Sequence, residues 1–255
     1  MSADLVCAVV VATDGGQNAR PTAQALGRQT RPPDRIVEAA SPEGLRAVLD
    51  LEWTWLWLLE AGVAPQPLAL EALLKALERT ETLPAPVLLA SRIVGGDGLL
   101  QERALPVVEV LRADLALAAV DARLLALRAA RPGSLLVHRR AIRDRGLPRL
   151  RSELDYLEWT AGLLKDELGL LVPSSVVVCL GAGLARGRVE LMSRLRFVRG
   201  QALAPRERPW FAFHVAQEAL SGPQQRIRAV RARAAAAARR AGRAGRRARS
   251  RHSDS

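Results

Sequence analysis

Residues 5–12 read LVCAVVVA, a continuous apolar run rich in β-branched side chains, and the chain then turns polar at Thr13-Asp14-Gly15-Gly16. A half-exposed strand alternates apolar and polar residues, whereas a strand covered on both faces is apolar throughout. The run therefore predicts a central strand of a parallel sheet over residues 5–12.

The segments after this strand alternate between helix and strand signals. Ser41-Pro42-Glu43 combines an N-cap residue, a proline at the first helical position and an acid in the first turn, which predicts a helix reaching about Asp50. The other predicted helices span residues 19–29, 68–79, 139–145 and 155–165, and the other predicted strands span 34–37, 53–59, 87–94, 133–138 and 169–179. Residues 99–131 are rich in Leu and Ala and fit either a helix or a strand. This alternation predicts an α/β fold with a mostly parallel central sheet flanked by helices and right-handed crossovers.

Polar residues follow three of the predicted strands. They are Thr13 and Asp14 after the first strand, Glu38 after the second, and Glu60, which Ala61 and Gly62 follow, after the third. Ligands of open α/β sheets bind outside the carboxyl ends of the strands. We therefore expect these positions to form the rim of one cleft.

Most of the net charge of +12 lies at one end of the chain. The segment from Gln224 to Ser255 has eleven arginines and one acid, a net +10, which leaves 12 − 10 = +2 for the preceding residues. Such a charge block cannot bury a core and is typical of an interaction tail. We therefore expect two parts, a folded domain over 1–222 and a basic tail over 223–255 that is partly helical or disordered and binds an anionic membrane surface.

Several classes of function lack their sequence signals. Cys7 and Cys179 lie far apart, so a disulfide framework or a zinc site is not expected, and no phosphate-binding loop or nucleophile motif occurs. The tail has no interleaved aromatic residues, so no specific nucleic-acid partner is expected. Without a signal sequence or a long apolar span, we expect a cytoplasmic protein that attaches peripherally to the inner face of the plasma membrane.

The order of the motifs resembles a family 2 glycosyltransferase with the GT-A fold, of the bacterial rhamnosyl- and galactofuranosyltransferase type. The run QTRPPDRIV at residues 29–37 is similar to that family's donor-side segment, and WLWLLEAGVAP at 55–65 stands where the family has W-x-W-x-L-Asp-Asp-Asp-x-x-Pro. GSLLV at 133–137 resembles the acceptor-side strand, and DYLEWT at 155–160 resembles the D-D-x-E-[FYW]-[ST] signature. The resemblance covers residues 5 to about 180 and implies a nucleotide-sugar enzyme.

The sequence departs from the family at its acids. The family binds a divalent metal, Mn²⁺ or Mg²⁺, through the acid triplet, of which Glu60 alone is present here. The nucleoside-binding Asp of the family is replaced by Glu38 or Ala40, and the second acid of the signature is Tyr156. The resemblance thus implies a metal site reduced to Glu60.

The resemblance also implies a role for each retained residue. It indicates inverting hexosyl transfer from a nucleoside-diphosphate sugar to a glycan or lipid-linked acceptor, in the making of a cell-envelope polysaccharide. Asp155 is the expected general base, with Glu158 positioning the acceptor or the base. The remaining expected contacts are Thr13, Asp14, Glu38 and Glu60 to the donor, and Gly133, Ser134 and Trp159 to the acceptor. Because the metal site is weakened, we expect the charge of the diphosphate to be met by one ion held by Glu60 or by arginines such as Arg139, Arg140 or Arg194.

A second interpretation stays open. The lost acids also fit a catalytically inactive descendant that keeps the fold as a binding or scaffold protein. In that case Asp155 and Glu158 are the acids of a solvated helix start, and Glu60 is a loop carboxylate. Trp53, Trp55 and Trp57 are expected in the core under either interpretation.

Overall fold

The structure is a computed structural model, and it divides into two units, residues 1–208 and 209–255. The residues that it describes are 5–12, 19–39, 41–80, 84–95, 100–101, 104–106, 123–130, 132–148, 153–180, 197, 203, 208–209 and 211–212. The expected domain boundary at 222 and the basic tail lie outside the described residues. No helix in the described ranges is long and apolar enough to cross a bilayer.

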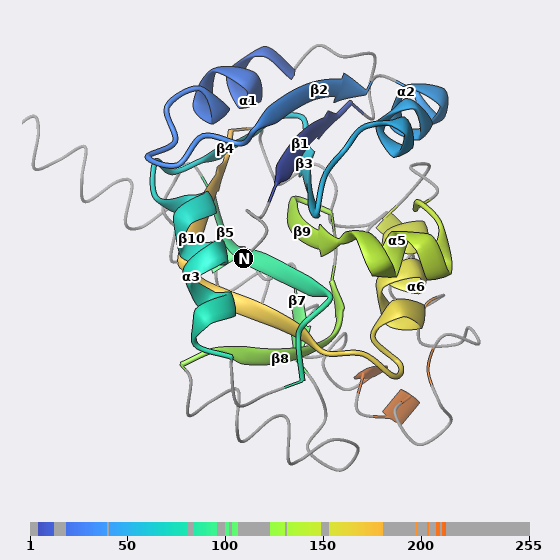
Figure 1. The fold of residues 1–255 in the computed structure, drawn as a ribbon. Helices are drawn as coiled ribbons and strands as arrows, with labels where there is room; N and C mark the ends of the chain where they lie inside the picture. Colours follow the sequence, from blue (N-terminus) through green and yellow to red (C-terminus); the bar gives the residue numbers. More distant parts are fainter. Residues whose placement is uncertain are drawn as a thin grey trace, which may run out of the picture. The chain divides into compact units, whose positions relative to one another are not determined.

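The first unit consists of strands and helices, which largely alternate as far as its fifth strand (Figure 1). The strands are β1 (Val6–Val11), β2 (Arg35–Ala39), β3 (Trp55–Glu60), β4 (Val63–Pro65), β5 (Leu88–Gly95), β6 (Leu100–Gln101), β7 (Ala104–Pro106), β8 (Leu125–Ala130), β9 (Ser134–His138) and β10 (Gly169–Cys179). The helices are α1 (Ala19–Leu26), α2 (Pro42–Ala47), the 3-10 helix η1 (Val48–Asp50), α3 (Ala69–Glu78), α5 (Arg139–Arg145) and α6 (Glu153–Leu163).

These elements confirm the predicted α/β fold class. The expected helix to Asp50 is present as α2 followed by η1, and Ser41 caps it by accepting from the Gly44 amide at 3.2 Å. The undecided stretch 99–131 contains the strands β6, β7 and β8. Sequence reasoning missed β4, because it treated Pro65 as part of a loop, although proline fits a short strand at its end.

One mixed sheet runs through the unit in the order β2-β1-β3-β9-β5-β10-β8-β7, with β4 paired to β10 and β6 to β5. Strand β1 is parallel to both β2 and β3, and β5 is parallel to β10. Strand β9 is antiparallel to both of its neighbours, β3 and β5. The central strands β2, β1, β3, β5 and β10 therefore point the same way, and β9 between them points the opposite way.

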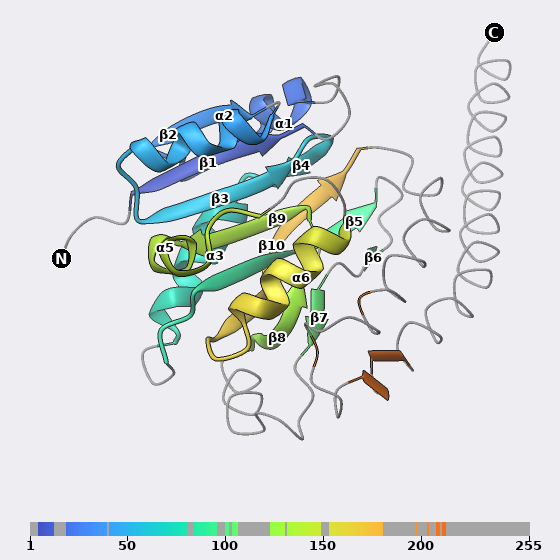
Figure 2. The same cartoon turned by 90° about the vertical axis from the view of Figure 1, so that its right-hand side faces the viewer.

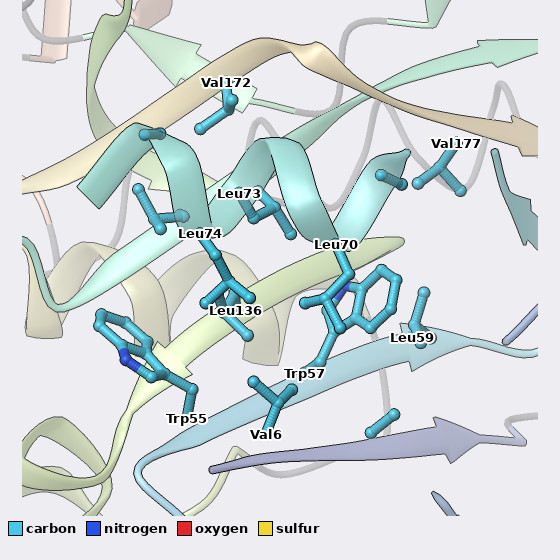
Figure 3. Close-up of a cluster of buried hydrophobic side chains, with 14 of the residues drawn as sticks. Val6, Trp55, Trp57, Leu59, Leu70, Leu73, Leu74, Leu136, Val172 and Val177 are labelled. Atoms are coloured by element: carbon cyan, nitrogen blue, oxygen red, sulfur yellow. The ribbon is translucent and has the colours of Figure 1, made fainter. Parts of the chain in front are cut away.

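Helices cover both faces of this sheet. Helices α1 and α3 lie on one face, and α2, α5 and α6 lie on the other (Figures 1 and 2). The first face holds a buried cluster in which Trp55, Trp57 and Leu59 of β3 meet Leu70 and Leu73 of α3 (Figure 3). The second face holds a cluster that includes Leu56 and Leu58 of β3 and Tyr156 and Leu163 of α6. The expectation that Trp53, Trp55 and Trp57 are core residues is confirmed, since their exposures are 3%, 4% and 0%.

Two side chains of the QTRPPDRIV stretch, at residues 29–37, form hydrogen bonds with the backbone of other elements. The Gln29 amide nitrogen donates to the Gln66 carbonyl at 2.9 Å, and its amide oxygen accepts from the Leu70 amide at 3.1 Å, which holds the start of α3. A carboxylate oxygen of Asp34 accepts from the Val6 amide at 2.7 Å, which holds the start of β1. The polar residues of this stretch thus fix where two neighbouring elements begin.

Candidate functional site

The carboxyl ends of β1, β2 and β3 meet at one edge of the sheet, as the sequence predicts. Val11, the last residue of β1, is in register with Ala39 on one side and with Glu60 on the other. Backbone hydrogen bonds continue past the strand ends, from the Ala12 amide to the Ala39 carbonyl at 3.1 Å and from the Ala61 amide to the Val11 carbonyl at 2.8 Å. Residues 12, 39 and 60 are therefore held at the rim of this edge.

Glu60 points toward the face that α6 covers. Side chains alternate along a strand, and Leu56 and Leu58 pack in the cluster of that face. The Glu60 amide donates to the Gly133 carbonyl at 3.0 Å, and only 9% of Glu60 is exposed. Gly133 has a φ of 149°, a conformation that favours glycine. Glu60 thus lies at the sheet edge, where its backbone contacts the residue that leads into β9.

The two residues that replace acids after Glu60 form a fixed turn. Gly62 has a φ of 85°, a left-handed conformation that glycine adopts at no steric cost. Its amide donates to the Thr22 hydroxyl at 3.2 Å, and its carbonyl accepts from the Leu180 amide at 2.8 Å. Ala61 packs against the cluster that contains Trp57. The turn is therefore held by hydrogen bonds of its backbone to the Thr22 hydroxyl and the Leu180 amide, and neither Ala61 nor Gly62 carries a side-chain oxygen.

The residues at this turn do not fit a divalent metal. Hard cations such as Mn²⁺ and Mg²⁺ take several oxygen ligands, usually from carboxylates. Glu60 offers one carboxylate, and within the described ranges no group of three His, Cys, Asp or Glu side chains is placed to hold a metal ion. The described part of the site therefore provides too few ligands for the metal that the family resemblance implies.

Helix α6 carries the two remaining acids of the signature. Asp155 is half-buried, whereas Glu158 is exposed, so the two carboxylates differ in their access to water although they lie three residues apart. Tyr156, at the place of the second acid, is buried with 4% exposure in the cluster of that face. Burial raises the pKa of the Tyr156 hydroxyl, and the negative charge of Glu60 raises it further. The phenol is therefore neutral near pH 7 and lies within electrostatic range of Glu60.

Ser134 is committed to a buried chain of hydrogen bonds across the sheet. Its hydroxyl accepts from the Trp57 indole N–H at 3.0 Å and lies 2.7 Å from the Ser91 hydroxyl. Ser91 is 2.8 Å from Ser175, which donates to the Ala69 carbonyl at 2.9 Å. Sequence reasoning missed this chain, and its signal is a serine in each of the apolar strands β5, β9 and β10. The Ser134 side chain is 1% exposed and points away from the face that holds Glu60.

The other expected donor and acceptor residues are only partly brought together. Trp159 is half-buried, packs against the second cluster and donates its indole N–H to the Gly146 carbonyl at 3.0 Å. Glu38 is exposed, and it faces the side opposite to Glu60 because its neighbours Val37 and Ala39 pack in the second cluster. The expectations for Thr13 and Asp14 fall outside the described residues.

Two arginines expected at the donor diphosphate lie elsewhere. Strand β9 runs antiparallel to β3, so its last residue, His138, pairs with Trp55 at the amino end of β3. Arg139 follows there and donates from its amide to Thr54 and from its side chain to the Trp53 carbonyl at 3.2 Å. The expectation for Arg139 is therefore wrong, since it lies at the opposite edge from Glu60.

Arg140 follows Arg139 at the same opposite edge. Its guanidinium donates to the Ala85 carbonyl at 2.7 Å and to the Glu167 carboxylate at 3.2 Å. The expectation that it meets the diphosphate is also wrong, and Arg194 lies outside the described residues.

Comparisons with known proteins agree on the fold. No protein-family model matches the sequence, and no curated protein matches it. Among solved structures, the mannosyltransferase PcManGT from Pyrobaculum calidifontis, in complex with GDP-Man and Mn²⁺, is similar over 92% of this chain and 75% of its own, with 13% identity and a TM-score of 0.51. GalNAc-T7 with UDP, GalNAc and Mn²⁺ is similar over 78% of this chain, with 11% identity and a TM-score of 0.50. The chain has the GT-A glycosyltransferase fold.

The lengths of the matched chains differ. This chain spans 48% of the GalNAc-T7 chain. TarS of S. aureus, residues 1–349, is similar over 80% of this chain and 68% of its own, with 8% identity and a TM-score of 0.49. At the identities of PcManGT and GalNAc-T7, the likeness concerns the fold.

Proposed function

We propose that the protein is a family 2-type glycosyltransferase that transfers a sugar from a nucleoside-diphosphate donor to a glycan or lipid-linked acceptor. One observation carries this proposal. Glu60 is hydrogen-bonded to Gly133, the residue before β9, at the carboxyl edge of a GT-A sheet and on the face covered by α6. In α/β sheets this edge is the usual place for a ligand. The solved structures of PcManGT and GalNAc-T7, which hold a nucleotide and Mn²⁺, support a donor of the same chemical class.

The chemistry assigns the proton transfer to α6. The acceptor hydroxyl attacks the anomeric carbon of the donor, its oxygen forms the new glycosidic bond, and its proton passes to the Asp155 carboxylate. The bond from the anomeric carbon to the diphosphate oxygen breaks, and the nucleoside diphosphate leaves with the electron pair, which inverts the anomeric centre. Glu158, one helical turn after Asp155 and exposed, is suited to orient the acceptor.

The charge of the leaving diphosphate needs positive partners. The described acids at this edge do not fit a divalent metal, so no step is assigned to one. Arg194 remains as a candidate partner of the diphosphate, because Arg139 and Arg140 lie at the opposite sheet edge. The proposed acceptor contacts are the backbone of Gly133, the backbone of Ser134 and the ring of Trp159.

The remaining proposals concern location and role. We assign the transferase domain to residues 1–222 and membrane attachment to the basic tail over 223–255, and a cell-envelope polysaccharide is the proposed product class. A cytoplasmic location at the inner face of the plasma membrane follows from these proposals, because the tail would bind its anionic lipids.

A second candidate function is a non-catalytic nucleotide-sugar binding or scaffold protein. The turn at Ala61 and Gly62 favours it, because hydrogen bonds to Thr22 and Leu180 hold this turn and its side chains provide no ligand oxygen. The two functions differ in whether bound donor is consumed.

Replacement of the proposed base separates the two functions. Asp155→Asn should lower the rate of sugar transfer by at least about 100-fold while the donor still binds, because it removes the proton acceptor and keeps the size of the side chain. Asp144→Asn, on the exposed surface of α5, is the matched control and should transfer at the wild-type rate. Full activity of Asp155→Asn contradicts the assigned base, and donor binding by the wild type without any transfer supports the scaffold function.

A further inference from the structure

A buried hydroxyl of helix α6 is hydrogen-bonded to the sheet. Thr160 is 0% exposed, and its hydroxyl accepts from the Ala130 amide at 2.9 Å. The hydroxyl proton has two close acceptors, the Ala130 carbonyl at 2.9 Å and the Tyr156 carbonyl at 2.8 Å. A single side chain of α6 thus satisfies backbone groups at the end of β8.

The attachment point lies three residues before Gly133. Ala130 ends β8, and the carbonyl of Gly133 accepts the hydrogen bond from the Glu60 amide at 3.0 Å. The Thr160 hydroxyl therefore joins the helix that carries Asp155 to the segment that contacts Glu60. Two parts of the candidate site, which are far apart in the sequence, share this short stretch of backbone.

A second side chain of β8 strengthens the attachment. Arg128 is 7% exposed, and its guanidinium donates to the carbonyl of Ala161, the residue after Thr160. Ala161 lies in the last turn of α6, where carbonyl groups lack partners within the helix and a positive charge is favourable. Helix α6 is consequently fixed at its carboxyl end to the same strand that leads to Gly133.

We propose that Thr160 is a positioning residue that sets the distance and orientation of Asp155 relative to Glu60 through its hydrogen bonds to Ala130. This inference rests on the proposed function for its catalytic consequence. It concerns a residue that contacts neither donor nor acceptor, so it predicts an effect on turnover and not on donor affinity.

The test compares three variants of the full chain. Thr160→Val keeps the shape of the side chain and removes the hydroxyl, whereas Thr160→Ser keeps the hydroxyl. Thr80→Val is the matched control, because Thr80 is 4% exposed, lies two residues after α3, and donates its hydroxyl proton to the nearby Leu77 carbonyl at 2.8 Å. For each variant kcat and the donor KM of sugar transfer are measured, together with hydrogen exchange of the α6 amides.

The inference predicts a split between the two kinetic constants. Thr160→Val should lower kcat on the order of 10- to 100-fold with the donor KM within about 2-fold of the wild type. Thr160→Ser should recover most of kcat, and Thr80→Val should leave both constants near their wild-type values. An unchanged kcat in Thr160→Val, or equal losses in Thr160→Val and Thr160→Ser, would overturn the inference.

Hydrogen exchange distinguishes this inference from the proposed function. If the wild type transfers no sugar, the proposed function fails, and the exchange data still decide whether Thr160 fixes α6. Faster exchange along α6 in Thr160→Val, restored in Thr160→Ser, supports the attachment. Equal exchange in all variants overturns it.

Discussion

The amide of Glu60 donates a hydrogen bond to the carbonyl of Gly133 over 3.0 Å, and this bond joins the end of β3 to the residue before β9. It brings together two positions that are more than seventy residues apart in the sequence. Because β9 is antiparallel to β3, its first residues lie at the same sheet edge as the last residues of β3. The proposed donor and acceptor sides of the site therefore share one backbone contact.

The buried serine chain should contribute to stability. Ser134→Ala removes the acceptor of the Trp57 indole N–H, which is then buried without a partner, at a cost of about 1–3 kcal/mol in the free energy of unfolding. Ser174→Ala, at an exposed position on β10, is the control and should change stability by less than about 0.5 kcal/mol. Urea denaturation measures both. Unchanged stability of Ser134→Ala with a raised acceptor KM would instead favour direct contact with the acceptor.

Two glycine replacements should have opposite effects. Gly62→Ala places a side chain at a φ of 85° and should cost roughly 1–2 kcal/mol of stability. Gly162→Ala, in α6, meets no atom within 4 Å of the added carbon and should gain up to about 1 kcal/mol from helix propensity. Thermal unfolding of the two variants should shift in opposite directions. A neutral Gly62→Ala would show that the turn after Glu60 tolerates a side chain.

The sequence predicted where the strands lie along the chain better than it predicted the directions in which they run in the sheet. The range of β10 was predicted in full, because the apolar and β-branched residues on both sides of Pro173, Ser174 and Ser175 favour a strand. The direction of β9 is not encoded in its composition, since GSLLVH suits a strand that points either way. The expectation that Arg139 and Arg140 meet the diphosphate requires β9 to point the same way as β1, and it failed for this reason.

The faces of the side chains were equally hard to predict. Whether Glu38 and Ser134 point toward Glu60 depends on the register of their strands, and a shift of one residue reverses the face. Val10 pairs with Glu38 and Leu59 pairs with Ser134, so both side chains point to the face opposite to Glu60. By contrast, the placement of Glu60 at the carboxyl edge followed from the strand order alone.

The stability of the protein should fall at alkaline pH through Cys7. Burial raises the pKa of the Cys7 thiol from 9.0 to about 11, with Arg35 opposing the shift. Between these values the unfolded chain releases a proton that the folded chain keeps, so unfolding becomes more favourable as the pH rises. From pH 8 to pH 10 the wild type should lose roughly 1 kcal/mol more stability than Cys7→Ala in urea denaturation. Equal losses in the two proteins would contradict this assignment.

The basic tail should be dispensable for folding and necessary for membrane binding. A chain truncated after Gly222 loses eleven arginines and should no longer sediment with vesicles that contain anionic lipids at moderate salt. Its thermal unfolding should match that of the full chain, and neutral phosphatidylcholine vesicles, which neither chain should bind, are the control. Retained binding of the truncated chain to anionic vesicles would place membrane attachment in the domain itself.

The central claim is that the carboxyl edge beside Glu60 binds a nucleotide sugar, and calorimetric titration of the full chain with UDP-, GDP- and dTDP-sugars tests it most directly. The account predicts saturable binding of at least one of them, with an affinity that changes less than about 3-fold on addition of Mn²⁺, because the described acids do not fit a metal. Glu60→Gln should alter this affinity, whereas Asp144→Asn should not. The absence of binding by every sugar nucleotide at millimolar concentration, with and without Mn²⁺, would contradict the account.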